Sequence, residues 1–175
     1  MLFRSLTFAR VLRAEFERQG WRVVLTRPGN ENPSFDDRAA IANAERDAVF
    51  LSLHVSSTGA AGTARAYYFD PAQFEREPAA ASSAEHGLLR WELAQAPFVQ
   101  QSRRLAEFLQ VQLAQKFRGT PEVATPCAVR QLRTIVAPAV AIEVSSISAD
   151  PATFGRMAAP LAEAASRALA AFRQA

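Results

Sequence analysis

Residues 48–54 have the sequence AVFLSLH and residues 139–143 have the sequence AVAIE, and these two stretches decide how the chain folds. Each is a short apolar run that ends in one ionisable residue, His54 or Glu143. Such runs, placed between helical stretches, are typical of strands buried on both faces of a parallel sheet. Ligands bind at the carboxyl ends of these strands, so we expect His54 and Glu143 to share one crevice.

The two residues together suggest hydrolytic chemistry. An imidazole can bind a metal ion, and a carboxylate can accept and return a proton. Two structural alternatives stay open: His54 hydrogen-bonded to a neighbouring loop, and Glu143 in an ion pair with Arg130 or Arg133. The other histidine, His86, lies in a polar stretch, so the sequence by itself gives an incomplete set of metal ligands.

Composition favours one globular domain over residues 1–175. The chain is 49% hydrophobic, and its 20 basic residues are spread along the sequence and nearly matched by 17 acidic ones. No basic cluster alternates with aromatic residues, which argues against a nucleic-acid partner. The single cysteine, Cys127, has no internal disulfide partner. We find neither an apolar run long enough to span a membrane nor a signal-peptide core, and expect neither in this chain.

The periodicity of apolar residues predicts an α/β domain of three layers, with a mainly parallel central sheet flanked by helices. Residues 70–97 lack this periodicity, so we expect a surface insertion or lid there. The first predicted helix begins almost at the first residue and stops before Gly20; the others cover about 34–44, 98–117 and 151 or 154 to 172. The predicted strands cover 21–26, 48–54, 64–69 (as a sheet edge), 128–136 and 139–144. The chain opens with a helix, whereas doubly wound domains generally open with a strand.

Four segments occur in an order that resembles the zinc-dependent N-acetylmuramoyl-L-alanine amidases, which cut peptidoglycan. In chain order the segments are Val-Val-Leu-Thr-Arg at 23–27, Asp-Arg-Ala-Ala-Ile-Ala-Asn at 37–43, Ser-Leu-His at 52–54 and Pro-Ala-Val-Ala-Ile-Glu at 138–143. The resemblance covers nearly the whole chain. It implies hydrolysis of the amide between the lactyl group of muramic acid and L-alanine, with peptidoglycan or a muramyl peptide as the partner.

The resemblance also implies roles for the two residues. His54 takes the place of the family's second histidine ligand of zinc, and Glu143 takes the place of its catalytic glutamate. In the family, two histidines and a glutamate hold a Zn²⁺ ion that activates water. The complete protein is then expected in the periplasm or cell envelope.

The beginning of the chain departs from the family pattern. Family members open with a strand and a Gly-His-Gly-Gly-like loop that supplies the first histidine, and the glutamate ligand begins the next helix. Residues 1–5 contain neither a histidine nor a glutamate. We therefore expect an N-terminally incomplete amidase domain that lacks the first strand and two zinc ligands, which leaves its activity open. The alternative is a non-catalytic module that keeps the amidase fold to bind cell wall or regulate a partner.

Overall fold

The structure is a computed structural model, and it describes residues 2–73, 91–145 and 151–175. None of the helices in these ranges has the length and apolar character needed to cross a membrane. The helices are α1 (Leu2–Arg18), α2 (Phe35–Asn43), α3 (Val99–Lys116) and α4 (Pro151–Gln174), with short 3₁₀ turns η1 (Pro71–Gln73), η3 (Trp91–Leu93) and η4 (Ala96–Phe98); the strands are β1 (Phe50–Ser56), β2 (Ala64–Phe69), β3 (Thr125–Cys127) and β4 (Ala139–Ser145).

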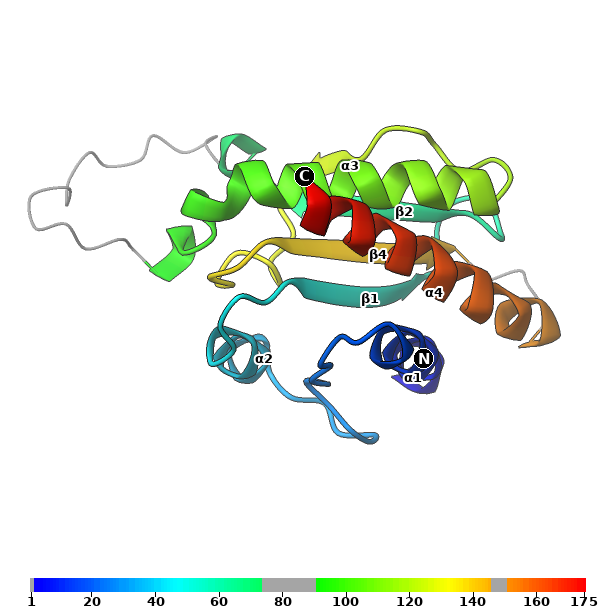
Figure 1. Cartoon of the computed structure of the whole chain (residues 1–175), viewed down its shortest axis with the longest axis horizontal. Helices are drawn as coiled ribbons and strands as arrows, with labels where there is room; N and C mark the ends of the chain where they lie inside the picture. The colour runs from blue at the N-terminus through cyan, green and yellow to red at the C-terminus, as the bar shows by residue number, and fades with distance from the viewer. Residues whose placement is uncertain (1, 74–90, 146–150) are drawn as a thin grey trace, which may run out of the picture.

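The four strands form one sheet in the order β1-β4-β2-β3 (Figure 1). β1 runs parallel to β4, β3 runs parallel to β2, and β2 runs antiparallel to β4. Two of the three pairings are therefore parallel. Of the seven residues of β4, all except Glu143 are buried, as expected of a strand with a neighbour on each side.

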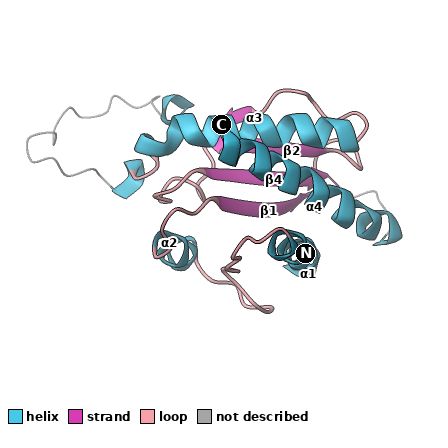
Figure 2. Ribbon diagram, viewed as in Figure 1, coloured by secondary structure: helices cyan, strands magenta, loops and turns pink. Residues whose placement is uncertain are grey.

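Helices flank the sheet, with α3 and α4 over one face and α1 and α2 next to β1 (Figure 2), which confirms the predicted α/β fold with a central sheet flanked by helices. On one face, Val140, Ile142 and Val144 of β4 pack with apolar residues of α1, α3 and α4. On the other face, Ala139 and Ala141 pack with α2 and the segment 129–137. Side chains of a strand point alternately to its two faces, so the sheet separates two apolar clusters.

The predicted helices are confirmed, and α2 shows why its start could be recognised. Ser34 precedes the helix, and its hydroxyl accepts a hydrogen bond from the backbone N–H of Asp37. The Asp37 carboxylate accepts one in return from the backbone N–H of Ser34. This capping box pairs two backbone donors that the helix leaves unused.

Three strand predictions were wrong. Residues 21–26 have no regular secondary structure and no strand pairing, and residues 128–136 form a turn at 130–134 with irregular backbone around it. The partner of β2 on its outer side is the three-residue β3, so β2 is an inner strand and not an edge. Apolar periodicity predicts an extended conformation, but it cannot show which backbone lies alongside.

The segment 70–97, predicted as an insertion or lid, is described only at its two ends. At the later end, the fully buried Gln95 donates from Nε2 to the carbonyl oxygens of Ile135 (3.1 Å) and Ala137 (2.9 Å). Residues 91–97 are thus attached to the segment that leads into β4. Residues 74–90, including His86, lie outside the described residues, so their role stays a prediction.

Leu109 of α3 provides a test of the core. Its side chain is fully buried against the sheet, so Leu109→Ala is expected to lower the free energy of unfolding by about 2–5 kcal/mol. Val111 lies on the same helix with 48% of its surface exposed, and Val111→Ala is expected to change stability by less than about 0.5 kcal/mol. Chemical denaturation of both variants measures the difference. Equal losses would contradict the packing described here.

Candidate active site

Three polar residues lie side by side across the sheet. His54 of β1 is paired with Glu143 of β4, and Glu143 is paired with Arg65 of β2. Directly paired residues on neighbouring strands project from the same face of a sheet. The predicted juxtaposition of His54 and Glu143 is therefore present, and Arg65 extends it into a row.

The imidazole of His54 is positioned by its own strand. Its Nε2 lies 2.9 Å from the hydroxyl oxygen of Ser52, two residues earlier on the same face. Burial lowers the pKa of His54, the negative charge of Glu143 opposes that shift, and the positive charge of Arg38 adds to it. A neutral imidazole has a lone pair with which it can bind a metal ion.

The ion pair with Arg130 or Arg133 that the sequence left open for Glu143 is not formed in the structure. Within the described part of the chain, no salt bridge joins Glu143 to either arginine. The Arg130 guanidinium instead lies over the ring of Phe35, 5.6 Å from its centroid. Glu143 is half-buried at the carboxyl end of a central strand, where a carboxylate can move a proton.

Two further residues near Glu143, Arg65 and Tyr67 of β2, could not be assigned to the site from the sequence. They alternate with the fully buried Ala64 and Ala66, so they project from the other face of the strand, together with Glu143. Burial raises the pKa of Tyr67, and the charge of Glu143 raises it further, while Arg65 opposes the shift. Residues 64–69 carry consecutive aromatic residues, and nothing in this stretch of sequence points to Glu143. The relation of Arg65 and Tyr67 to Glu143 required the antiparallel pairing of β2 with β4.

These residues do not complete a zinc site by themselves. A catalytic zinc ion in a protein is held by three protein ligands. In the ranges that the structure describes, no three histidine, cysteine, aspartate or glutamate side chains cluster in a way that could hold a metal. Of the residues in this row, His54 has the chemistry of a single zinc ligand.

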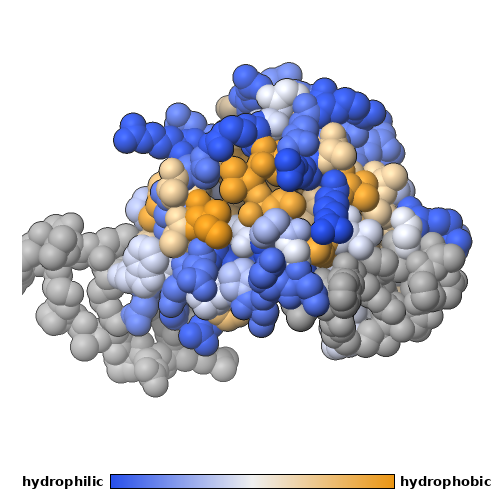
Figure 3. Space-filling view, turned by 90° about the horizontal axis from the view of Figure 1, so that it is seen from below, coloured by the Kyte–Doolittle hydropathy of each residue, from blue (hydrophilic) through white to orange (hydrophobic). Residues whose placement is uncertain are grey.

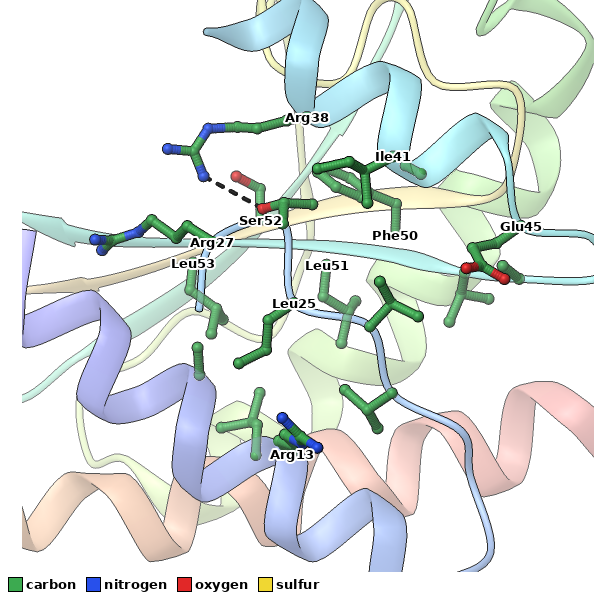
Figure 4. A pocket seen from close by; sticks show the side chains of 18 of the residues that line it. Arg13, Leu25, Arg27, Arg38, Ile41, Glu45, Phe50, Leu51, Ser52 and Leu53 are labelled. Atoms are coloured by element: carbon green, nitrogen blue, oxygen red, sulfur yellow. Dashed lines mark hydrogen bonds between the residues drawn. The ribbon is translucent and has the colours of Figure 1, made fainter. Parts of the chain in front are cut away.

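A cavity of about 650 Å³ lies along the outer edge of β1, and His54 is among the residues that line it. It lies between residues 48–54 and the segment 21–27, with α1 and α2 contributing further walls. Leu25, Leu51 and Leu53 reach into this space, as Figure 4 shows. On the side of α1 and α2, hydrophobic residues gather at the middle of the molecular surface (Figure 3).

The sheet carries a histidine and a glutamate on adjacent parallel strands, an arrangement compatible with an α/β hydrolytic enzyme. The comparison with protein families is more specific, because the model of the N-acetylmuramoyl-L-alanine amidases matches residues 4–153. The chain belongs to this amidase family, which acts on peptidoglycan. A search of curated proteins finds no significant match.

Solved amidase structures share the fold. The N-acetylmuramoyl-L-alanine amidase of Clostridium difficile 630 has 18% sequence identity and a TM-score of 0.68 over 97% of this chain and 82% of that protein. Ami1 of Mycobacterium smegmatis has 20% identity and a TM-score of 0.65 over 95% of this chain and 74% of that one. AmiC2 of Nostoc punctiforme has 17% identity and a TM-score of 0.65, with 97% and 82% covered.

The lowered pKa of His54 predicts how stability depends on pH in metal-free protein. The unfolded chain protonates this imidazole near its ordinary pKa of 6.5, whereas the folded chain does so at lower pH. Protonation of His54 therefore has no effect well above pH 6.5, and it destabilises the fold increasingly as pH falls below that value. The decline ends once the folded imidazole is protonated as well.

Denaturation of the wild type and of His54→Gln between pH 7.5 and 5.5, with a chelator present, measures this effect. The wild type is expected to lose more stability than the variant over this range. NMR titration of His54 gives its pKa directly, and a value above 6.5 would overturn the expectation.

Proposed function

We propose that this chain is the greater part of a peptidoglycan hydrolase domain that cleaves the amide between N-acetylmuramic acid and L-alanine with a zinc-activated water. The observation that carries the proposal is the pairing of His54 with Glu143 across two parallel strands in a chain of the amidase family. The substrate is peptidoglycan or a muramyl peptide, and the complete protein acts in the periplasm or cell envelope.

Each residue has one role in this proposal. His54 is a zinc ligand, and Glu143 takes the proton from the attacking water and passes it to the departing amine. Bound zinc lowers the pKa of water to about 7 and polarises a carbonyl group. Glu143 is suited to its role because it stands beside His54 without an ion-pair partner among the described residues.

The two further ligands come, in our proposal, from an extended segment that precedes α1 in a longer form of the protein. Two segments, β1 and residues 22–26, have backbone groups to which this segment could hydrogen-bond. β1 pairs only with β4 in the described sheet, and its seven residues are all half-buried, although most are apolar. On the other side of the cavity, residues 22–26 have no regular secondary structure and make no backbone–backbone hydrogen bonds within the described chain.

Backbones with unused N–H and C=O groups on two sides of a cavity with apolar walls in its middle suit one inserted strand. The N-terminal part of α1 lies at this cavity, since Ser5 and Leu6 line it together with Leu53 and His54. A strand inserted parallel to β1 would therefore end close to the beginning of α1 and bring its ligands close to His54.

The part of the chain that the structure describes holds no cluster of three metal-ligating side chains, which also favours a second function, a non-catalytic module that binds cell wall or regulates an active partner. Zinc analysis of the purified chain separates the two. Stoichiometric, tightly bound zinc would eliminate the module, whereas a metal-free chain that binds muramyl peptides without cleaving them would support it.

Glu143 and His54 can be tested in a longer protein in which a strand, a Gly-His-Gly-Gly-like loop and a glutamate precede α1. This protein is expected to bind zinc and to release peptides with a free N-terminal L-alanine from muramyl peptides. Glu143→Gln is expected to keep the zinc content and lose about 10²–10⁴-fold in turnover, because it removes the proton acceptor. Mass spectrometry of the products and metal analysis give the two readouts.

His54→Ala in the same protein is the matched comparison, and it is expected to lower zinc content together with activity. Ser57→Ala, on the exposed loop after β1, is expected to change neither. A fully active Glu143→Gln protein would refute the assignment of Glu143 as the proton acceptor.

The inserted strand has a separate readout in backbone hydrogen exchange. Adding the segment is expected to slow exchange of those β1 amides that point away from β4 by more than about tenfold, because they gain hydrogen bonds. Amides that already bond to β4 serve as internal controls. An extension with proline at alternate positions lacks these backbone donors and is expected to give less protection. Unchanged exchange along β1 with the unmodified extension would show that the strand does not insert there.

A further inference from the structure

Two arginines from different elements meet at the end of the cavity that lies next to His54. Arg27 follows the segment 21–26, and Arg38 belongs to α2. Figure 4 shows both near Ser52 and Leu53. Arg27 is only 8% exposed, which is uncommon for a charged side chain.

Both guanidinium groups donate hydrogen bonds to neutral oxygen atoms. Arg27 donates to the hydroxyl of Ser5 at 2.9 Å and to the carbonyl oxygen of Gly29 at 3.4 Å. Arg38 donates to the carbonyl oxygen of Pro33 at 3.2 Å and to the hydroxyl of Thr26 at 3.3 Å. Within the described residues Arg38 forms no salt bridge, so its charge is not neutralised by a carboxylate.

The positive charges at this end of the cavity act on one another. Burial lowers the pKa of Arg38, and the charge of Arg27 lowers it further. The acidic side chain labelled in Figure 4, Glu45, lies at the opposite end of the cavity and is paired with Arg22. An anion bound between Arg27 and Arg38 would relieve their repulsion.

We propose that Arg27 and Arg38 bind a carboxylate of the substrate. A guanidinium presents five N–H donors in a planar fork that matches a carboxylate, and Arg38 uses two of its five within the described chain. The site lies beside His54, where the amide to be cut is held in the function proposed above, on which this inference rests. A muramyl peptide ends in a carboxylate, so this pair fixes the peptide side of the substrate.

Two ligands that differ only in charge test the site in the full chain. N-Acetylmuramyl-L-alanyl-D-glutamate is expected to bind at least about tenfold more tightly than its diamide, since charge-assisted hydrogen bonds are the stronger kind. The preference is expected to shrink at high salt. Calorimetric or NMR titration measures both affinities.

Arg38→Gln is expected to reduce the preference to less than about twofold, while Arg38→Lys, which keeps the charge, retains part of it. Arg46→Gln is the matched control, because Arg46 is an exposed arginine that lines the same cavity, and it is expected to keep the preference. If Arg38→Gln does not fold, the proposal is still tested by the relative affinities of the wild type and of Arg38→Lys for the acid and the diamide.

The outcomes separate the two proposals. Equal binding of the acid and the diamide by the wild type would overturn the carboxylate site and leave the amidase proposal intact. A preference that survives in Arg38→Gln would also overturn the site. Failure of both compounds to bind would overturn the site and remove support for a muramyl peptide substrate, and the cleavage assay of the longer protein would then judge the amidase proposal.

Discussion

The parallel pairing of β1 with β4 is the contact on which the rest of the structure depends. It buries the apolar residues of β4 between two helical layers, and its register places His54 directly opposite Glu143. A shift of one residue would turn the imidazole and the carboxylate to opposite faces of the sheet. The same hydrogen-bond ladder therefore determines both the core and the site.

Features that depend on nearby residues could be predicted from the sequence. Ser34 and Asp37 mark the start of α2, and the apolar runs before His54 and Glu143 identify the two strands of the site. The positions of His54 and Glu143 follow from the rule that ligands bind at the carboxyl ends of parallel strands. His54 and Glu143 could therefore be paired without knowing the conformation of the loops that follow their strands.

Features that depend on distant partners could not be predicted. The sequence of residues 21–26 favours a strand, but strand formation needs a neighbouring backbone, and none of the described residues supplies one. Residues 128–136 have strand-like composition, yet they do not form a strand. They contribute Leu132 and Ile135 to the apolar cluster that also contains Ala139 and Ala141 of β4. Arg65 became relevant only through its antiparallel partner Glu143.

The attachment of Gln95 to Ile135 and Ala137 has a consequence for how the sequence can vary. Gln95 is fully buried and donates from Nε2 to two carbonyl oxygens of the segment that leads into β4. Any side chain without these donors would leave two carbonyl oxygens without their partner, and buried polar groups without a partner are costly. This position should therefore tolerate few substitutions although it lies far from His54 and Glu143 in the sequence.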